Sequence, residues 1–371
     1  MNSAATLPSH ASPPSLLAGE KALTFPLGDA LPPLGGALAV APGIFWIRMQ
    51  LPFALDHINL WLLEDTETSP TGTRTGWTVV DCGVTNPGTQ AAWEQVFVGA
   101  MKGLPILRVI VTHMHPDHMG LAHWLCAKFD APLQISATEY QSAVLSSNGT
   151  SNFGGVGTQR FFSANGWNNP EDQEKVNSRI FYYNKMVPSV PETYRRMMDG
   201  QCLQIGGRMW RCISGWGHSP EHIALHCESE KVLISGDMVL PKISTNVSVY
   251  TQEPEGDSLT LFLSSLQKFA TLSADTLVLP SHGRVFQGLH TRIAQLVHHH
   301  EERLQEVLEA CLEKPGSAYD MLTVIFKRPL DFHQTTFAMG ESVAHLHALW
   351  HAGKMRRFQD DQGVWRFQTL C

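Results

Sequence analysis

The stretch Thr112-His113-Met114-His115-Pro116-Asp117-His118 decides the fold class of this chain. It packs three imidazoles and one carboxylate into six positions, directly after the apolar run 106–111. A run of branched aliphatic residues predicts a buried strand, and open α/β folds place their chemistry in loops at the carboxyl ends of strands. Zinc, iron and manganese accept imidazole and carboxylate ligands, so the stretch predicts a metal site. The alternative is a polar loop that is rich in histidine by chance.

Four further apolar runs each end in a loop that carries one histidine or aspartate. In chain order these loops are Asp81-Cys82-Gly83, Gly217-His218-Ser219-Pro220, Ser235-Gly236-Asp237 and Pro280-Ser281-His282-Gly283. One such loop alone would mean little. Five strand ends that each present a ligand-type residue are hard to obtain by accident, so the pattern favours a functional metal site.

At these residues the chain resembles the metallo-β-lactamase fold superfamily, over about residues 35–285. The signature of that superfamily is His-x-His-x-Asp-His, followed on later strand ends by a histidine, a bridging aspartate and a final histidine. The resemblance implies two divalent metal ions and a buried aspartate, here Asp81, that orients ligands through hydrogen bonds. The implied ligands are His113, His115 and His218 for one ion, Asp117, His118 and His282 for the other, and Asp237 as the bridge.

The order of strand and helix patterns predicts an α/β fold, an αββα sandwich of two mixed sheets between helices. We expect an irregular, proline-rich N-terminal arm over residues 1–33 and the catalytic domain over residues 34–286. An aromatic insertion at about 146–200 is expected to form a lid or pocket wall, and the alternatives are extra core or a dimer contact. Within it, residues 171–186 and 191–198 are predicted to be helical.

Residues 287–371 carry the pattern of three helices and a β-hairpin. The helices are expected at 289–311, 318–326 and 335–351, and a turn at residues 360–363 closes the hairpin. The arrangement resembles the winged-helix domain of one branch of the superfamily, which includes lactamase-like hydrolases and endoribonucleases. A helix that reads nucleic acid should carry several basic residues, and residues 335–351 contain none. We therefore expect a packing or dimerisation module and no binding of nucleic acid.

The composition limits where the protein acts and what it binds. The net charge of −7 argues against a general affinity for polyanions. No apolar run approaches the ~18 residues of a membrane span, and the N-terminus lacks the pattern of a secretory signal. Seven cysteines form no Cys-x-x-Cys motif and are expected to be reduced, with Cys82 a buried apolar side chain. We expect a cytoplasmic homodimer without membrane contact.

The implied chemistry is that of a dimetal hydrolase. Two divalent metals can share a hydroxide whose pKa is lowered to near neutrality, and this metal-bound hydroxide attacks the substrate. Asp117 or Asp237 would then act as the catalytic carboxylate that holds the proton and passes it to the leaving group. Zinc is the metal expected first, although the same ligands suit iron or manganese.

The substrate is predicted from the site and its surroundings to be a small molecule, namely an ester, thioester or lactone. The alternative is a metal-dependent phosphodiesterase or endoribonuclease that acts on single-stranded RNA. The motif set is that of glyoxalase II, but the chain shows no counterpart of the C-terminal helical segment that binds thioesters in that enzyme.

A few polar residues outside the motif need an interpretation of their own. His57 and Asn59, at the start of the predicted strand 58–61, have either a pocket role or a packing role. Glu221 is expected to face solvent. The remaining clustered histidines lack a clear third ligand and are expected on the surface or in packing: His298-His299-His300, His347 and His351.

Overall fold

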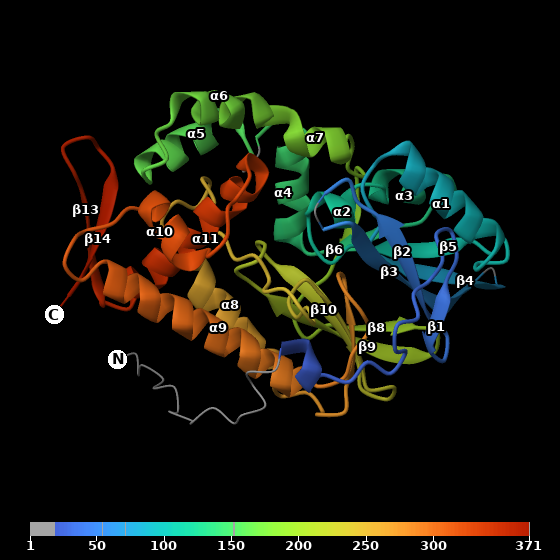
Figure 1. The fold of residues 1–371 in the computed structure, drawn as a ribbon. Coiled ribbons are helices and arrows are strands. Elements are labelled where there is room, and N and C mark those ends of the chain that lie inside the picture. Colours follow the sequence, from blue (N-terminus) through green and yellow to red (C-terminus); the bar gives the residue numbers. More distant parts are fainter. Residues whose placement is uncertain (1–18, 54, 71, 151–152, 371) are drawn as a thin grey trace.

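The computed structural model describes residues 19–53, 55–70, 72–150 and 153–370. The expected N-terminal arm lies outside the described residues as far as residue 18, and from 19 to 33 the described chain has neither α-helix nor strand. Two mixed β-sheets lie between helices, and a small domain of helices and a short sheet follows them (Figure 1). The predicted αββα sandwich is confirmed.

The first sheet has the strand order β1-β2-β3-β4-β5-β6-β7, antiparallel from β1 to β4 and parallel from β4 to β7. Its strands are β1 Leu38–Ala41, β2 Ile44–Gln50, β3 His57–Ser69, β4 Gly72–Val80, β5 Ile106–Ile110, β6 Leu133–Ile135 and β7 Tyr194–Arg196. Helices α1 (Pro87–Val98) and α3 (Ala122–Phe129) cover one face, where Trp93 and Leu125 are fully buried. The side chain of Asn86 caps α1, and proline suits its first turn because that turn leaves backbone N–H groups unpaired.

The second sheet has the order β12-β11-β10-β9-β8, in which β11 and β12 are parallel and the other neighbours are antiparallel. Its strands are β8 Cys202–Ile205, β9 Arg208–Gly215, β10 His222–Cys227, β11 Val232–Gly236 and β12 Leu277–Pro280. Helix α8 (Ser258–Phe269) packs on this sheet. Trp46, Trp61 and Trp210 are fully buried in one apolar cluster that joins the two sheets. Because this interior is apolar, polar side chains can gather only where the strands end.

The insertion between β6 and β7 is helical over most of its length. Its helices are α4 Ala137–Ser147, α5 Gly155–Ala164, α6 Pro170–Ser178 and α7 Tyr182–Met186, with a 3₁₀ turn, η2, at Arg179–Phe181. The predicted helix at 191–198 is wrong, because β7 pairs there with β6 and places Tyr194 opposite Leu133. Tyr194 also stacks on Tyr140 of α4, with 4.0 Å between the ring centroids. Sheet pairing and this aromatic contact override the weak helical pattern of a short polar segment.

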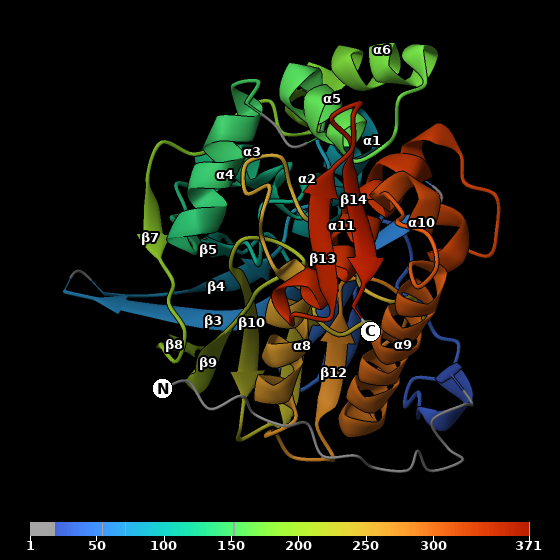
Figure 2. The same cartoon turned by 90° about the vertical axis from the view of Figure 1, so that its left-hand side faces the viewer.

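The C-terminal part contains the predicted helices and hairpin. They are α9 Leu289–Ala310, α10 Ala318–Ile325, α11 Phe332–His351, β13 Met355–Gln359 and β14 Trp365–Thr369. The hairpin β13–β14 lies beside α11 (Figure 2). Helix α11 also packs on α8, and the two share one hydrophobic core in which Phe262, Val343 and Leu346 are fully buried. The winged-helix assignment itself stays a prediction.

The insertion and the C-terminal part are far apart in sequence but contact each other. Helices α5 and α6 lie over α10 and α11 in Figure 1. The ring of Trp167, between α5 and α6, lies 6.3 Å from the ring of Tyr319 and 5.8 Å from that of Phe332.

Among the described residues, every helix is too short or too polar to span a membrane.

Candidate metal centre and its pocket

The seven predicted ligands come together where strands of both sheets end. Strands β5, β9, β11 and β12 lead into loops that carry four of them, and the short helix α2 (Pro116–Met119) carries or adjoins the others. The seven side chains form three overlapping groups, and within each group the ligand atoms lie within 4.8 Å of one another. In chain order these ligands are His113, His115, Asp117, His118, His218, Asp237 and His282.

One group consists of three histidines. The Nε2 of His113 lies 2.9 Å from the Nδ1 of His115 and 3.2 Å from the Nε2 of His218. A single N–H group cannot satisfy all three ring nitrogens at these distances. At least two nitrogens therefore direct lone pairs toward the same point. Such an arrangement becomes favourable when a cation accepts the lone pairs.

The second group contains carboxylates. The Oδ2 of Asp117 lies 3.4 Å from the Nε2 of His282 and 3.7 Å from the Nε2 of His118. The Oδ1 of Asp237 lies 3.5 Å from the Nε2 of His118 and 3.6 Å from that of His282. Its other oxygen, Oδ2, lies 3.3 Å from the Nε2 of His218. Asp237 therefore has one oxygen toward each group, which is the position that the resemblance implies for a bridge.

Hydrogen bonds to backbone carbonyls fix the tautomers of two ligands. The Nδ1 of His218 donates to the carbonyl of Asn246 at 2.7 Å, and the Nδ1 of His282 donates to the carbonyl of His57 at 2.8 Å. A carbonyl oxygen can only accept, so each ring carries its proton on Nδ1. The Nε2 atoms of both rings then face the other ligands, and each offers a lone pair to a metal once it carries no proton.

Asp81 orients a third ligand, as the resemblance implies. Its Oδ2 lies 2.8 Å from the Nδ1 of His118, and its Oδ1 accepts from the backbone N–H of Thr112 at 2.8 Å. Asp81 is buried and has a φ of 64°, in the left-handed region that is strained for a residue with a side chain. The strain is offset by these hydrogen bonds, which hold the carboxylate against the ligand loop.

Two family descriptions match the chain. Residues 56–282, more than half of its length, match "Metallo-beta-lactamase superfamily". Residues 304–370 match "Metallo-beta-lactamase-like, C-terminal domain". The chain belongs to the metallo-beta-lactamase superfamily.

Individual proteins of this superfamily are similar over most of the chain. It is 48% identical to a beta-lactamase domain protein from Burkholderia ambifaria, whose crystal structure covers 95% of this chain and is itself covered to 99%, with a TM-score of 0.88. It is 24% identical over 313 residues to "Probable metallo-hydrolase YqjP" of Bacillus subtilis, which covers 82% of this chain and 91% of that protein. A shorter match, 26% identical over 114 residues, joins 31% of this chain to 33% of "Atrochrysone carboxyl ACP thioesterase" of Aspergillus fumigatus. The chain is a metallo-hydrolase of this superfamily.

Glu139 connects two ligand loops of this metallo-hydrolase through hydrogen bonds, and no sequence motif predicts this role. Its Oε2 accepts from the backbone N–H of Met114 at 2.8 Å, between His113 and His115. Its Oε1 accepts from the hydroxyl of Ser219 and the backbone N–H of Glu221, both at 2.6 Å. Burial raises the pKa of this carboxyl although its three donors favour the charged form. The signal that could be read in the sequence, the spacing of Ser136 and Glu139, indicates only the start of a helix.

His57 and Asn59 hold the loop that carries His282. The backbone N–H of Gly283 donates to the Nε2 of His57 at 2.9 Å. The Nδ2 of Asn59 donates to the carbonyls of Pro280 at 2.8 Å and of Gly283 at 2.9 Å. Both residues therefore act by packing and hydrogen bonding at the edge of the site.

The electrostatics of the two groups differ. Burial disfavours charge on His118 and His282, but the nearby carboxylates outweigh it and raise the pKa of His118 to about 9 and that of His282 to about 10. Burial and the neighbouring imidazoles hold the pKa of His113 well below its usual range, and burial lowers that of His115 to about 3. One side of the site thus attracts positive charge, and the other presents neutral imidazoles.

The residues present fit two divalent ions. Two of the buried atoms that have no hydrogen-bond partner among the described residues are the Nε2 of His118 and the Oδ1 of Asp237, which lie 3.5 Å apart. A buried polar atom without a partner is costly, and a cation between these two atoms would satisfy both. The histidine and aspartate side chains could thus hold two metal ions.

A pocket of about 500 Å³ contacts this centre, a volume typical of small-molecule sites. Its floor consists of five of the seven ligands: His115, Asp117, His218, Asp237 and His282. The insertion contributes Phe153, Tyr182 and Met186, so it does form a wall of the pocket. The remaining walls come from Leu51, Phe53 and Leu55, from Leu240 and residues 243–246, and from residues of α11 and the segment that precedes it. Movement of the insertion as a lid stays a prediction.

Cys82, Glu221 and the clustered histidines of the C-terminal part do not line this pocket. Cys82 is buried, as predicted, and the carboxylate of Glu221 accepts from the hydroxyl of Thr138 at 2.7 Å outside the pocket lining. The remaining histidines belong to no metal-ligand group among the described residues. His298 lies 3.4 Å from a carboxylate oxygen of Glu302, whereas His347 is buried and donates to the carbonyl of Gly256 at 3.0 Å.

Proposed function

We propose that this protein is a dimetal hydrolase of small carboxylic esters, thioesters or lactones. The observation that carries the proposal is the cluster of seven candidate ligands, five of which form the floor of a largely apolar pocket of about 500 Å³. Such a pocket can bury a compact substrate almost completely and place its scissile group on the ligands.

The ligand set assigns two metal positions. His113, His115 and His218 would hold one ion, Asp117, His118 and His282 the other, and Asp237 both. Zinc is the metal that we expect, and iron or manganese would accept the same ligands. When bound, the two ions supply polarisation of the scissile carbonyl and a water molecule of lowered pKa as the nucleophile.

The residues of the chain itself position the reaction and move the proton. Asp117 and Asp237 line the pocket and lie on the floor where the scissile group would bind. We assign to one of them the transient binding of the proton from the attacking water and its delivery to the leaving group. Asp81 and Glu139 keep the ligand loops in place, so that the floor needs little reorganisation during the reaction.

The pocket walls favour an acyl substrate over RNA. Among the described residues that line the pocket, the only Lys or Arg is Arg328. An RNA-cleaving site should neutralise several phosphates, and one cation is too few for that. The similarity of part of the chain to a protein named as an acyl carrier protein thioesterase also supports the acyl class.

A substrate screen tests the proposal. The metal-loaded protein is assayed with small esters, thioesters and lactones beside a labelled single-stranded RNA. We expect turnover of acyl compounds that is lost in His113→Ala, retained in the control His298→Ala, and changed little by added salt. Metal-dependent cleavage of RNA without turnover of any acyl compound would reject the proposal in favour of the phosphodiesterase alternative.

A further inference from the structure

One face of helix α11 forms a long wall of the pocket. Gln334, Phe337, Ala338 and Glu341 line it at the spacing of one helix face. Gln334 and Glu341 are seven positions apart, or about 10 Å at 1.5 Å per residue. The wall therefore extends well beyond the space that a scissile ester group needs.

The Glu341 end of this wall lies near the metal centre. The carboxylate of Glu341 accepts from the Nδ2 of Asn246 at 3.1 Å, and the carbonyl of Asn246 accepts from the Nδ1 of His218 at 2.7 Å. Burial raises the pKa of Glu341 to about 7. The Gln334 end, at the N-terminus of α11, is then the end of the wall away from His218.

Arg328 lies at that far end. Its Nη1 donates to the Oε1 of Gln334 at 2.8 Å, and the side chain is exposed. Among the described residues, no carboxylate oxygen lies within 4 Å of its guanidinium nitrogens. Asp331, close by in sequence, has its carboxylate engaged as the cap of α11, where it accepts from the backbone N–H of Gln334 at 2.8 Å. The positive charge of Arg328 is thus available to a ligand.

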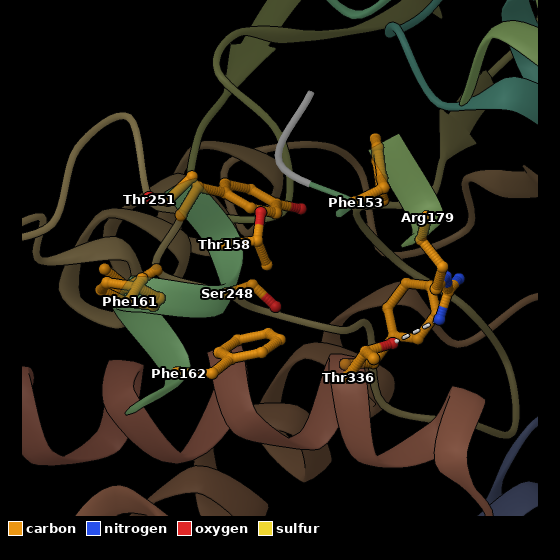
Figure 3. Close-up of a pocket in the computed structure, with 12 residues that line it drawn as sticks. Phe153, Thr158, Phe161, Phe162, Arg179, Ser248, Thr251 and Thr336 are labelled. Atoms are coloured by element: carbon orange, nitrogen blue, oxygen red, sulfur yellow. Dashed lines mark hydrogen bonds between the residues drawn. The ribbon is translucent and has the colours of Figure 1, made fainter. Parts of the chain in front are cut away.

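A second hydrogen-bond donor, His333, lines the same pocket from the first turn of α11 and precedes Gln334, the residue that Arg328 contacts. The Nη2 of Arg179, from the insertion, lies 3.2 Å from the Nδ1 of His333. Its Nη1 donates to the hydroxyl of Thr336 at 3.3 Å, the bond drawn as a dashed line in Figure 3, which shows a second, neighbouring pocket. A guanidinium can only donate, so Nδ1 of His333 accepts and the ring carries its proton on Nε2. No described residue accepts a hydrogen bond from this Nε2. Phe53 stacks on the ring at 5.7 Å between centroids and holds it at the pocket wall.

Most of the pocket lining apart from the metal ligands is apolar. Pocket residues that supply this surface are Leu240, Ile243, Phe326, Leu330, Phe337 and Ala338. A substrate that fills the pocket would therefore need an apolar middle, a reactive group at the metal end and a polar group at the far end.

We propose that the far end of the pocket is an anion subsite, in which Arg328 and the Nε2–H of His333 bind a carboxylate or phosphate of the substrate. This inference rests on the proposed acyl hydrolase function and names its substrate class: acyl compounds that carry an anion about 10 Å from the scissile carbonyl, the length of the α11 wall.

Paired substrates test the subsite and identify the source of the anion. One pair compares thioesters of a neutral thiol whose acyl chain ends in a carboxylate or in a methyl group. The other pair compares a neutral acyl group on a thiol with and without a phosphate monoester. We expect the wild-type protein to prefer the anionic member of one pair by about tenfold in kcat/KM, mainly through KM, because a charge-assisted contact is lost in the neutral member.

Three variants locate the effect. Arg328→Gln should abolish the preference, and His333→Phe should reduce it. Lys327→Gln is the matched control, since Lys327 neighbours Arg328 but lies 3.4 Å from a carboxylate oxygen of Glu306 and does not line the pocket. Equal turnover of both members of both pairs by the wild-type protein would overturn the subsite, as would an equal loss of preference in Lys327→Gln and Arg328→Gln.

A binding measurement separates the subsite from the catalytic proposal. Non-hydrolysable thioether analogues of the same pairs are titrated calorimetrically into the metal-loaded protein. Tighter binding of an anionic analogue that disappears in Arg328→Gln supports the subsite even where no acyl compound is turned over. Turnover of neutral thioesters together with equal binding of all analogues supports the proposed function and rejects the subsite.

Discussion

The floor and the wall of the pocket are built by different physical means. On the floor, ligands such as His218 and His282 are buried, and other residues fix their orientation by hydrogen bonds. The wall consists mainly of apolar and aromatic side chains, together with the exposed cation Arg328, from segments that follow or interrupt the sandwich. The floor depends on geometry that cannot vary, whereas the wall depends on contact area. We expect changes in the floor to abolish chemistry and changes in the wall to alter selectivity.

The largest effect is expected for the bridge, Asp237. Asp237→Ala removes the carboxylate that has one oxygen toward each ligand group. We expect the native protein to hold two metal ions per chain and the variant to hold fewer, with kcat/KM lower by about 10³-fold or more, as for the loss of a group that acts in the transition state. Elemental analysis of protein purified without chelator measures the stoichiometry. One ion in the native protein, retained in the variant, would contradict the bridging assignment.

Helix α11 also contains a buried group that makes the wall side of the molecule sensitive to pH. Burial lowers the pKa of His347 from its usual value of 6.5 to about 4. A depressed pKa means that the neutral form is favoured in the folded state. The stabilisation is therefore fully present above pH 6.5 and is lost as the pH falls through about 4, amounting to about 3 kcal/mol between pH 7 and pH 4.

The substitution His347→Gln tests this contribution of His347 to the free energy of unfolding. Glutamine does not titrate and can still donate to the carbonyl of Gly256. Urea unfolding of both proteins at pH 7 and pH 4 should show a smaller loss of stability in the variant, because loss of metal and all other titrations affect both alike. An equal loss in the two proteins would show that His347 is not buried as the structure has it.

The candidate ligands of the floor can be predicted from the sequence because each of them belongs to a local pattern. Each ligand lies just beyond an apolar run, so a single strand end can be recognised without knowledge of its partners. The orienting residues divide in the same way. Asp81 matched the superfamily pattern, whereas Glu139 reaches Met114 and Ser219 from a helix start that reads as an ordinary cap.

The part of the wall that α11 supplies could not be predicted because its contacts are tertiary. The stripe that was apparent in the sequence of α11, Val343, Leu346 and Trp350, belongs to the side that packs in the core. The pocket face, which contains Phe337 and Glu341, has no pattern that names its partner. The expectation of a packing module was therefore incomplete, because the same helix lines the pocket.

Glu139→Gln tests whether the floor extends to this residue. One amide oxygen replaces the two carboxylate oxygens, so an NH₂ group would then face the donors of either Met114 or Ser219. We expect metal affinity to fall about 10- to 100-fold, the usual effect of removing a partner that orients a ligand loop. Competition with a chelator measures the affinity, and Glu221→Gln is the control because its carboxylate bonds to Thr138 at the exterior. Unchanged affinity in Glu139→Gln would confine the floor to the ligands and Asp81.

The smallest effect is expected where the wall contributes area alone. Phe337→Ala removes an aromatic side chain from the middle of the α11 wall. Because lost apolar contact weakens binding of substrate and transition state equally, KM for an apolar acyl thioester should rise by about tenfold while kcat stays nearly constant. Phe181→Ala is the matched control, since Phe181 is 56% exposed and does not line the pocket. Steady-state kinetics, with metal content measured in parallel, distinguishes the two regions. A fall in kcat or a loss of metal in Phe337→Ala would mean that the wall supports the geometry of the floor. The distinction between a catalytic floor and a selective wall would then be wrong.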